Sequence, residues 1–170
     1  MRAVILHQLE LAELPSASGV EIVGDTVYVI GDDSPWLYRF SATDLTPGQP
    51  LPLFETAHFS SGRIAKALKP DLECLTALTT ATGETGLLVC GSGATAAREA
   101  GFWVPVPAAQ GPASPLVLSG LYAQLRQVLP AGVTLNLEAA AATTTELLLF
   151  QRTVGSAAGN LVFQLPLAAT

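Results

Sequence analysis

The chain has 170 residues, of which 49% are hydrophobic and 13% are charged, and its formal net charge is −6. This composition excludes a disordered chain, a coiled coil and a charged tail, and the acidic balance excludes the basic surface that binds DNA or RNA. The longest apolar runs, such as Leu147–Phe150, fall far short of the roughly 18 residues that span a membrane. Met1–Glu10 shows no secretory signal, so we expect a cytoplasmic protein that binds neither nucleic acid nor membrane.

Short strands are the expected elements, because Gly, Pro and Thr interrupt the chain too often for long helices. The first three predicted strands are Val20–Val23, Thr26–Ile30 and Trp36–Phe40. The dipeptide Gly24-Asp25 between the first two predicts a tight hairpin. The polar segment Gly31–Pro35 predicts the next turn.

The same order of elements recurs twice farther along the chain. The predicted strands are Leu72–Thr79, Gly86–Cys90 and Gly101–Val106, followed by Leu135–Ala142, Glu146–Gln151 and Asn160–Leu165. One short helix is predicted between these groups, over residues 120–129, with Ser119 as its N-cap. Cys74 and Cys90 fall in neighbouring strands and are predicted to be buried thiols.

The three groups of strands are interpreted as an internal repeat. Each group begins with an apolar residue followed by glutamate, at Glu21, Glu73 and Glu138, and ends with a strand that carries an aromatic residue. Units over residues 18–54, 71–106 and 135–167 predict an all-β protein with about three of the six blades of a β-propeller. An accidental pattern in another all-β protein and a mixed α/β domain that closes differently are the alternatives.

Three blades do not close a propeller ring. Residues 1–170 would then form a single partial propeller domain, and either they are the front part of a longer chain or two chains complete one ring. Unpaired blade edges at Met1–Leu11 and Asn160–Thr170 are expected to drive self-association.

Blade geometry predicts where the acidic side chains lie. The first strand of a blade is nearest the central axis, so Glu21, Glu73 and Glu138 are expected to share one orientation. They should meet Asp32 near one mouth of the channel, where the four carboxylates could hold calcium, which accepts oxygen ligands in irregular geometry. Alternatively, each glutamate accepts backbone N–H bonds where its blade begins and has only an architectural role.

Basic residues form a second candidate site. Four of them lie in or beside the loops between predicted strands and could bind phosphate or carboxylate groups: Arg63, Lys69, Arg98 and Arg152. The alternative is that they are ordinary solubilising charges. No nucleophile elbow and no serine–histidine arrangement is visible, so no catalytic residue is predicted.

Several segments resemble a bacterial family of uncharacterised β-propeller proteins: Leu14–Glu21, Val27–Pro35, Lys69–Cys74, Gly91–Gly93 and Asn136–Ala140. The resemblance covers essentially the whole chain and matches the first half of those longer proteins. More distantly, the opening Ser18–Glu21 and the turn Gly31–Asp33 resemble phytase-like and esterase-like propellers, some of which hold calcium in or near the channel. The resemblance implies that the acidic side chains lie at a channel mouth, but it implies no reaction.

Three hypotheses for the function follow. The first is a propeller that binds a cation such as calcium, or a small polar ligand, at the channel mouth and catalyses no reaction. The second is a metal-assisted phosphoester hydrolase, in which the acidic residues hold the metal and the basic residues hold the phosphate. The third is a scaffold whose aromatic surfaces, including Trp36 and Trp103, bind a partner protein.

Overall fold

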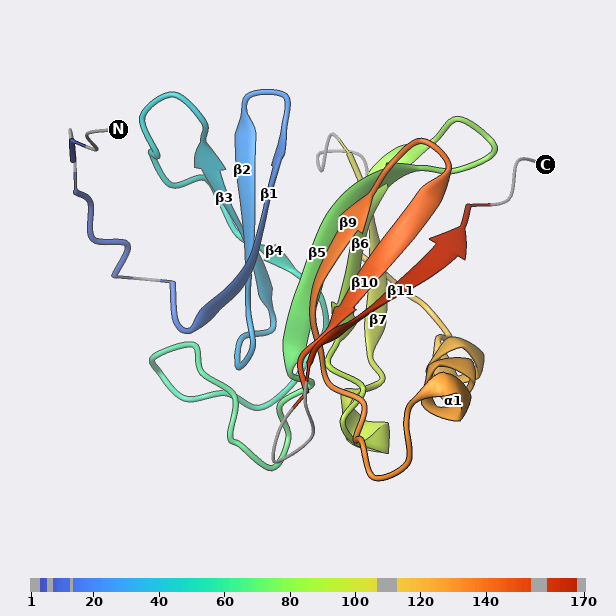
Figure 1. Cartoon of the computed structure of the whole chain (residues 1–170). Helices are drawn as coiled ribbons and strands as arrows, with labels where there is room; N and C mark the ends of the chain where they lie inside the picture. The colour runs from blue at the N-terminus through green and yellow to red at the C-terminus, as the bar shows by residue number, and fades with distance from the viewer. Residues whose placement is uncertain (1–3, 6–7, 13, 107–112, 154–158, 168–170) are drawn as a thin grey trace.

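The structure is a computed structural model that describes residues 4–5, 8–12, 14–106, 113–153 and 159–167 (Figure 1). These residues form three antiparallel sheets, in which each strand pairs with the next along the chain. The first sheet contains β1 (Ala17–Val23), β2 (Thr26–Gly31), β3 (Trp36–Ser41) and β4 (Leu51–Pro52). The second contains β5 (Leu72–Thr79), β6 (Thr85–Gly91), β7 (Gly101–Pro105) and β8 (Ser114–Pro115), and the third contains β9 (Leu137–Ala142), β10 (Glu146–Gln151) and β11 (Leu161–Pro166).

The predicted all-β class is confirmed, and the strands follow the apolar runs of the sequence. The hairpin at Gly24 is also confirmed: Val23 pairs with Thr26, and Gly24 has the positive φ of 57° that glycine adopts without strain. Strands β4 and β8 were not predicted. Each is two residues long and includes a proline, so neither shows the alternation of apolar and polar residues that identifies a strand.

The α-helix of the described residues, α1, spans Ser119–Val128. Its N-cap is Leu118, whose carbonyl accepts the bond from the Tyr122 N–H, and no side chain caps this end. The prediction that Ser119 is the N-cap is therefore wrong, because the first turn already begins at Leu118. A short 3₁₀ helix, η1 (Ala96–Arg98), precedes β7. No helix within the described ranges is long and apolar enough to cross a membrane.

The sheets stack in chain order, with an apolar layer between each pair. Strand β5 contacts both β1 and β9, as Figure 1 shows. The layer between the first and second sheets includes Ile30 and Leu37 from one side and Leu87 and Val89 from the other. The layer between the second and third sheets is completed by α1. Its buried residues are Cys74, Leu88, Cys90, Tyr122, Leu125, Leu135, Leu137, Leu147 and Leu149.

Strand β6 is the central strand of this stack. Leu87 and Val89 face the first sheet, whereas Leu88 and Cys90 face the third, so both faces of the strand are buried. A continuous apolar run is the sequence signature of such a strand. Cys74 and Cys90 pair across β5 and β6 as buried free thiols, as predicted. Among the described residues the three sheets form an open stack and do not close into a ring.

Candidate functional site

A β-bulge lies at the start of the first strand of each sheet. One residue there has no partner on the second strand: Ser18 in β1, Glu73 in β5 and Glu138 in β9. A backbone hydrogen bond joins the residue after the second strand to the residue before the first strand in every case. These bonds run from Asp32 N to Ser16 O (3.2 Å), Ser92 N to Asp71 O (2.8 Å) and Arg152 N to Asn136 O (3.0 Å). Bulges redirect the side chain of the extra residue, so this end of the stack presents one such side chain from each sheet.

This register corrects the alignment of the three glutamates. Ser18, and not Glu21, occupies the position of Glu73 and Glu138. Glu21 lies three residues farther along β1, where its Oε2 accepts a hydrogen bond from Ala77 N of β5 (2.9 Å) and its Oε1 accepts one from Ile22 N (2.9 Å). Glu21 thus accepts a hydrogen bond from a backbone N–H of β5. This is the architectural role that the sequence offered as the alternative for all three glutamates.

An open, polar pocket of about 440 Å³ lies at the bulges, and we call it the bulge pocket. Its lining consists of Ser16, Ala17, Ser18, Asp32, Glu73, Glu138 and Arg152. Three of the four acidic residues predicted for one mouth therefore lie around a single pocket, with Glu21 outside it. Among the four predicted basic residues, Arg152 lines the pocket.

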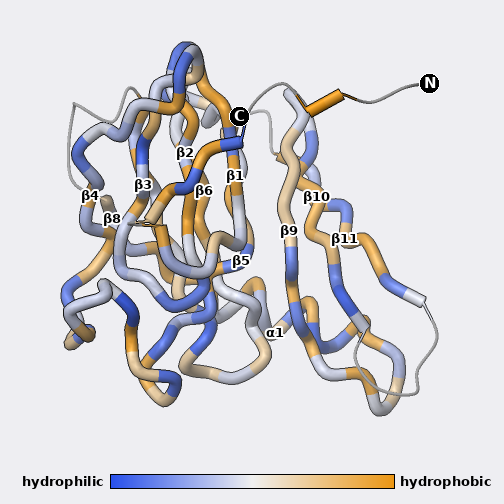
Figure 2. Tube along the Cα trace, turned by 90° about the vertical axis from the view of Figure 1, so that its left-hand side faces the viewer, coloured by the Kyte–Doolittle hydropathy of each residue, from blue (hydrophilic) through white to orange (hydrophobic). Residues whose placement is uncertain are grey.

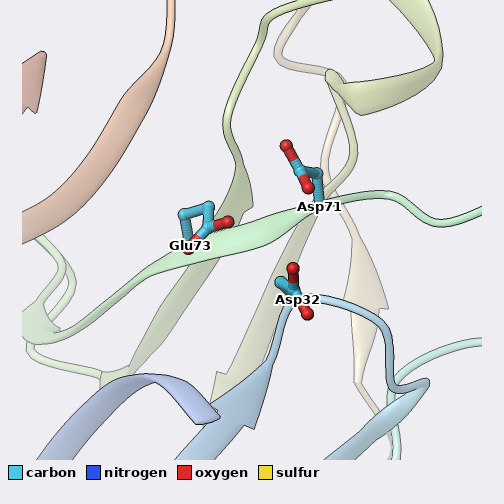
Figure 3. A group of neighbouring side chains, drawn as sticks. All are labelled: Asp32, Asp71 and Glu73. Carbon is cyan, nitrogen blue, oxygen red and sulfur yellow. The ribbon is translucent and has the colours of Figure 1, made fainter. Parts of the chain in front are cut away.

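Three carboxylates form a cluster at one side of the bulge pocket (Figure 3). Asp71 and Glu73 come from the start of β5, and Asp32 comes from the segment after β2. One oxygen of each lies within 4.8 Å of the others. Lys69 neutralises two of them: its Nζ lies 2.5 Å from Asp32 Oδ2 and 2.9 Å from Asp71 Oδ1. The other oxygen of Asp32, Oδ1, is buried and has no hydrogen-bond partner within the described part of the chain.

Asp71 is the most strongly bound member of this cluster. Its Oδ2 accepts a hydrogen bond from Ser92 Oγ (2.7 Å) and pairs with Arg98 Nη1 (2.9 Å). Burial alone would raise the pKa of Asp71, but the hydrogen bonds from Lys69 and Ser92 and the positive charges of Lys69 and Arg98 lower it overall. Burial would lower the pKa of Lys69, yet its bonds to Asp32 and Asp71 raise it. Asp71 and Lys69 are therefore both charged at neutral pH.

Glu73 differs from its acidic neighbours, because its carboxylate has no hydrogen bond or ion pair with any residue that the structure describes. Its pKa is raised to about 7, first by burial and then by the negative charges of Glu138, Asp71 and Asp32, while Lys69 opposes this rise. Glu73 is thus a carboxyl group that changes charge near neutral pH and has its bonding capacity free. This is the property of an acid–base group or of a ligand acceptor.

Glu138 is held from two sides. Its Oε1 accepts a hydrogen bond from Asn136 Nδ2 (2.5 Å) and pairs with Arg152 Nη2 (2.8 Å). The other predicted anion-binding residues also face carboxylates: Arg63 pairs with Asp33 (3.4 Å), Lys69 with Asp32 and Asp71, and Arg98 with Asp71. The four basic candidates thus all pair with carboxylates at the same end of the stack, and two of these carboxylates, Asp32 and Glu138, are acidic candidates, so the two predicted sites overlap.

Two contributors to this site, Asp71 and Ser18, were missed by the sequence analysis. The signal for them is the proline that precedes both bulges, since Pro15 and Pro70 stand at the same distance before Ser18 and Glu73. When the sequence is aligned on these prolines, Ser18 takes the same position as Glu73, and Asp71 is seen two residues before Glu73. The apolar–glutamate pattern hid this, because Glu21 satisfies the same pattern three residues later.

Comparison with known protein families finds a match to a family of unknown function, DUF6929. The match covers residues 13–170, which include every residue of the bulge pocket and of the ion pairs around it. No curated protein and no solved structure matches the chain.

Proposed function

The chain belongs to this family of unknown function, DUF6929, and we propose its function from the structure. The protein is a propeller-type protein that binds a small polar ligand in the bulge pocket. The ligand carries hydrogen-bond donors, either hydroxyl groups or an amine. The observation that carries this proposal is the free carboxylate of Glu73 on the wall of an open polar pocket.

The order of the strands supports the propeller part of the proposal. Each sheet is a meander whose first strand contacts the first strand of a neighbouring sheet (Figure 1). Blades of a propeller have this arrangement around the axis. The shared bulge and its closing hydrogen bond support the interpretation of each sheet as one blade.

The chemistry of the pocket wall supports a ligand with donors. Glu73 lines the pocket and offers two acceptor oxygens that no described protein group uses. Arg152 carries a positive charge and gives the pocket a hydrogen-bond donor as well, although it already pairs with Glu138. A polyol or an amino alcohol satisfies such a set of acceptors, whereas a phosphate would meet the carboxylates of Glu73 and Glu138.

A divalent cation is the second candidate, and the spacing of Asp32, Asp71 and Glu73 favours it. Calcium binds carboxylate oxygens at about 2.3–2.6 Å and accepts carbonyl oxygens and water as further ligands. Lys69 Nζ already binds Asp32 Oδ2 and Asp71 Oδ1, and its positive charge would repel such an ion. Calcium binding therefore requires that Lys69 move away, so the Lys69→Met variant should bind calcium more tightly than the unaltered protein.

Thermal unfolding distinguishes these candidates, because a ligand that binds only the folded state raises the melting temperature. The protein is first measured in excess EDTA and then with millimolar calcium chloride, glycerol, glucose, ethanolamine or inorganic phosphate as separate probes. We expect an upward shift with the polyols or the amino alcohol and its loss in Glu73→Gln. A shift with calcium that is enhanced in Lys69→Met would assign the pocket to a cation instead.

Glu55→Gln is the matched control, because Glu55 is exposed, lies outside the bulge pocket and loses the same charge. A probe that shifts Glu55→Gln and Glu73→Gln equally does not bind at Glu73. If none of the five probes shifts the melting temperature in a manner that depends on Glu73, the ligand part of the proposal fails, and the scaffold hypothesis becomes the better one.

A further inference from the structure

The two outer sheets of the stack each have one face that no other sheet covers, and both faces are apolar. On β1 the side chains alternate, so Glu21 points towards β5 while Val20 and Ile22 point the other way. Val20 and Ile22 are 64% and 60% exposed. Their cross-strand partners Val29 and Val27 belong to an apolar cluster on the same side, where Leu11 and Leu14 of the N-terminal segment pack on β2 and β3 and Val29 is buried. The uncovered part of this side is therefore the strip formed by Val20 and Ile22 of β1. We call this surface the first-sheet face.

The third sheet has a corresponding surface on its own outer side. Leu147 and Leu149 of β10 are buried against the second sheet, so Leu148 and Phe150 point outwards. Phe150 is 37% exposed, and its partner Val162 on β11 is 54% exposed. Figure 2 shows hydrophobic stretches along β10 and β11 at this side of the molecule. We call this surface the third-sheet face.

The sequence of β10 is that of a strand covered on both sides. Strand β6, in the middle sheet, contains the unbroken apolar run Leu87–Cys90 and is buried on both faces. Strand β10 carries an equivalent run, Leu147–Phe150, although it lies in an outer sheet. A sheet with one face in water normally alternates apolar and polar residues. The third-sheet face therefore has the composition of a buried surface.

We propose that a second copy of this chain covers these faces, with the third-sheet face of each copy packed on the first-sheet face of the other. Inside one chain, the outward face of each sheet already packs on the next sheet in the same order, and the new contact continues that series. The chain carries both halves of the interface, so a two-fold axis pairs all four faces and leaves none open. The result is a closed dimer of six sheets. This inference rests on the blade arrangement proposed above and is independent of the ligand.

The mass in solution tests the proposal, by size-exclusion chromatography with light scattering over a concentration series of the full chain. A dimer is expected. Val20→Glu and Phe150→Lys should each give a monomer, because either change places a charge in both copies of the interface. An equimolar mixture of the two variants should recover a dimer. In that mixed dimer one interface is unaltered and the other brings the new glutamate and lysine onto facing sheets.

Val117→Lys is the control for a general effect of charge, because Val117 is 94% exposed and lies on neither face. Circular dichroism confirms that the monomeric variants remain folded. A monomeric unaltered protein, an open-ended series of oligomers, or a dimer that responds to only one of the two variants would overturn the proposal. A monomer that still shows the Glu73-dependent ligand shift would overturn the dimer alone, so the two proposals fail separately.

Discussion

Glu73 and Glu138 occupy the same bulge position but have opposite electrostatic surroundings. Glu138 is paired with Arg152 and hydrogen-bonded by Asn136, whereas Glu73 faces carboxylates and has no direct partner among the described groups. The sequence predicted that both would lie near Asp32. It could not predict which of them would remain unpaired, because that depends on where Lys69 and Arg152 lie after the sheets have stacked.

The raised pKa of Glu73 makes stability depend on pH. In the unfolded chain Glu73 loses its proton near its ordinary pKa of 4.5, but the folded protein retains that proton up to about pH 7. The folded state therefore binds more protons between these values, and its stability falls as the pH rises through this window. Glu73→Gln should match the unaltered protein near pH 4 and should be more stable by about 1–3 kcal/mol at pH 8.

Denaturant unfolding at pH 4 and pH 8 measures this difference, with Glu55→Gln as the control that should show no such change. Equal effects of Glu73→Gln at both pH values would show that Glu73 has an ordinary pKa in the folded protein.

The bulged first strands and their closing hydrogen bonds are the elements that build the site. The chain passes close to itself there: a Cβ at Gly31 would approach the carbonyl oxygen of Pro15, and one at Gly91 would approach those of Pro70 and Arg98, in each case nearer than 3.0 Å. The third sheet has Gln151 at this place, and its side chain bonds to Asn136 N (2.7 Å) and Thr134 O (2.9 Å). The strands themselves could be predicted from periodicity. The bulges could not, because one additional residue leaves little trace in a pattern of apolar residues.

Gly91→Ala should destabilise the protein by about 2 kcal/mol or more, because both obstructing oxygens belong to the backbone and cannot rotate away. Gly120→Ala provides the comparison, since a Cβ at this position in α1 has no atom within 4 Å. It should be neutral or stabilising by up to about 1 kcal/mol, as expected for alanine in a helix. Thermal and denaturant unfolding measure the stability of both variants. If Gly91→Ala is as stable as the unaltered protein, the backbone around residue 91 can move enough to accept a Cβ.

At the scale of the whole molecule, the stack places the second sheet between two apolar layers, and the first sheet has a further, smaller apolar cluster on its outer face. The number and order of the strand groups could be predicted from the sequence, because short apolar runs separated by Gly-, Pro- and Thr-rich segments mark the strands. The order of layers and the open ends could not, because they depend on contacts between residues far apart in the chain, such as Glu21 with Ala77.

Amide hydrogen exchange should reflect this layering. The amides of β6, which is covered on both faces and paired with β5 and β7, should exchange most slowly, and those of β11 should exchange much faster. Exchange followed by NMR or mass spectrometry at low protein concentration measures the contrast. Protection of β11 as strong as that of β6 under those conditions would contradict the stack as described.

The bulges also separate part of the pocket lining from the backbone that carries it. Each is closed by atoms of the main chain, and the side chain of Glu73 takes no part in that closure. Ser18 differs, because its Oγ also donates a hydrogen bond to Leu72 O of β5 (2.6 Å). The three bulge positions share one backbone geometry, with one position in each sheet. Under the ligand-binding proposal, proteins with the same backbone would bind different ligands after an exchange of these side chains, with Glu73 the first to vary, while the rest of the sequence stays unchanged.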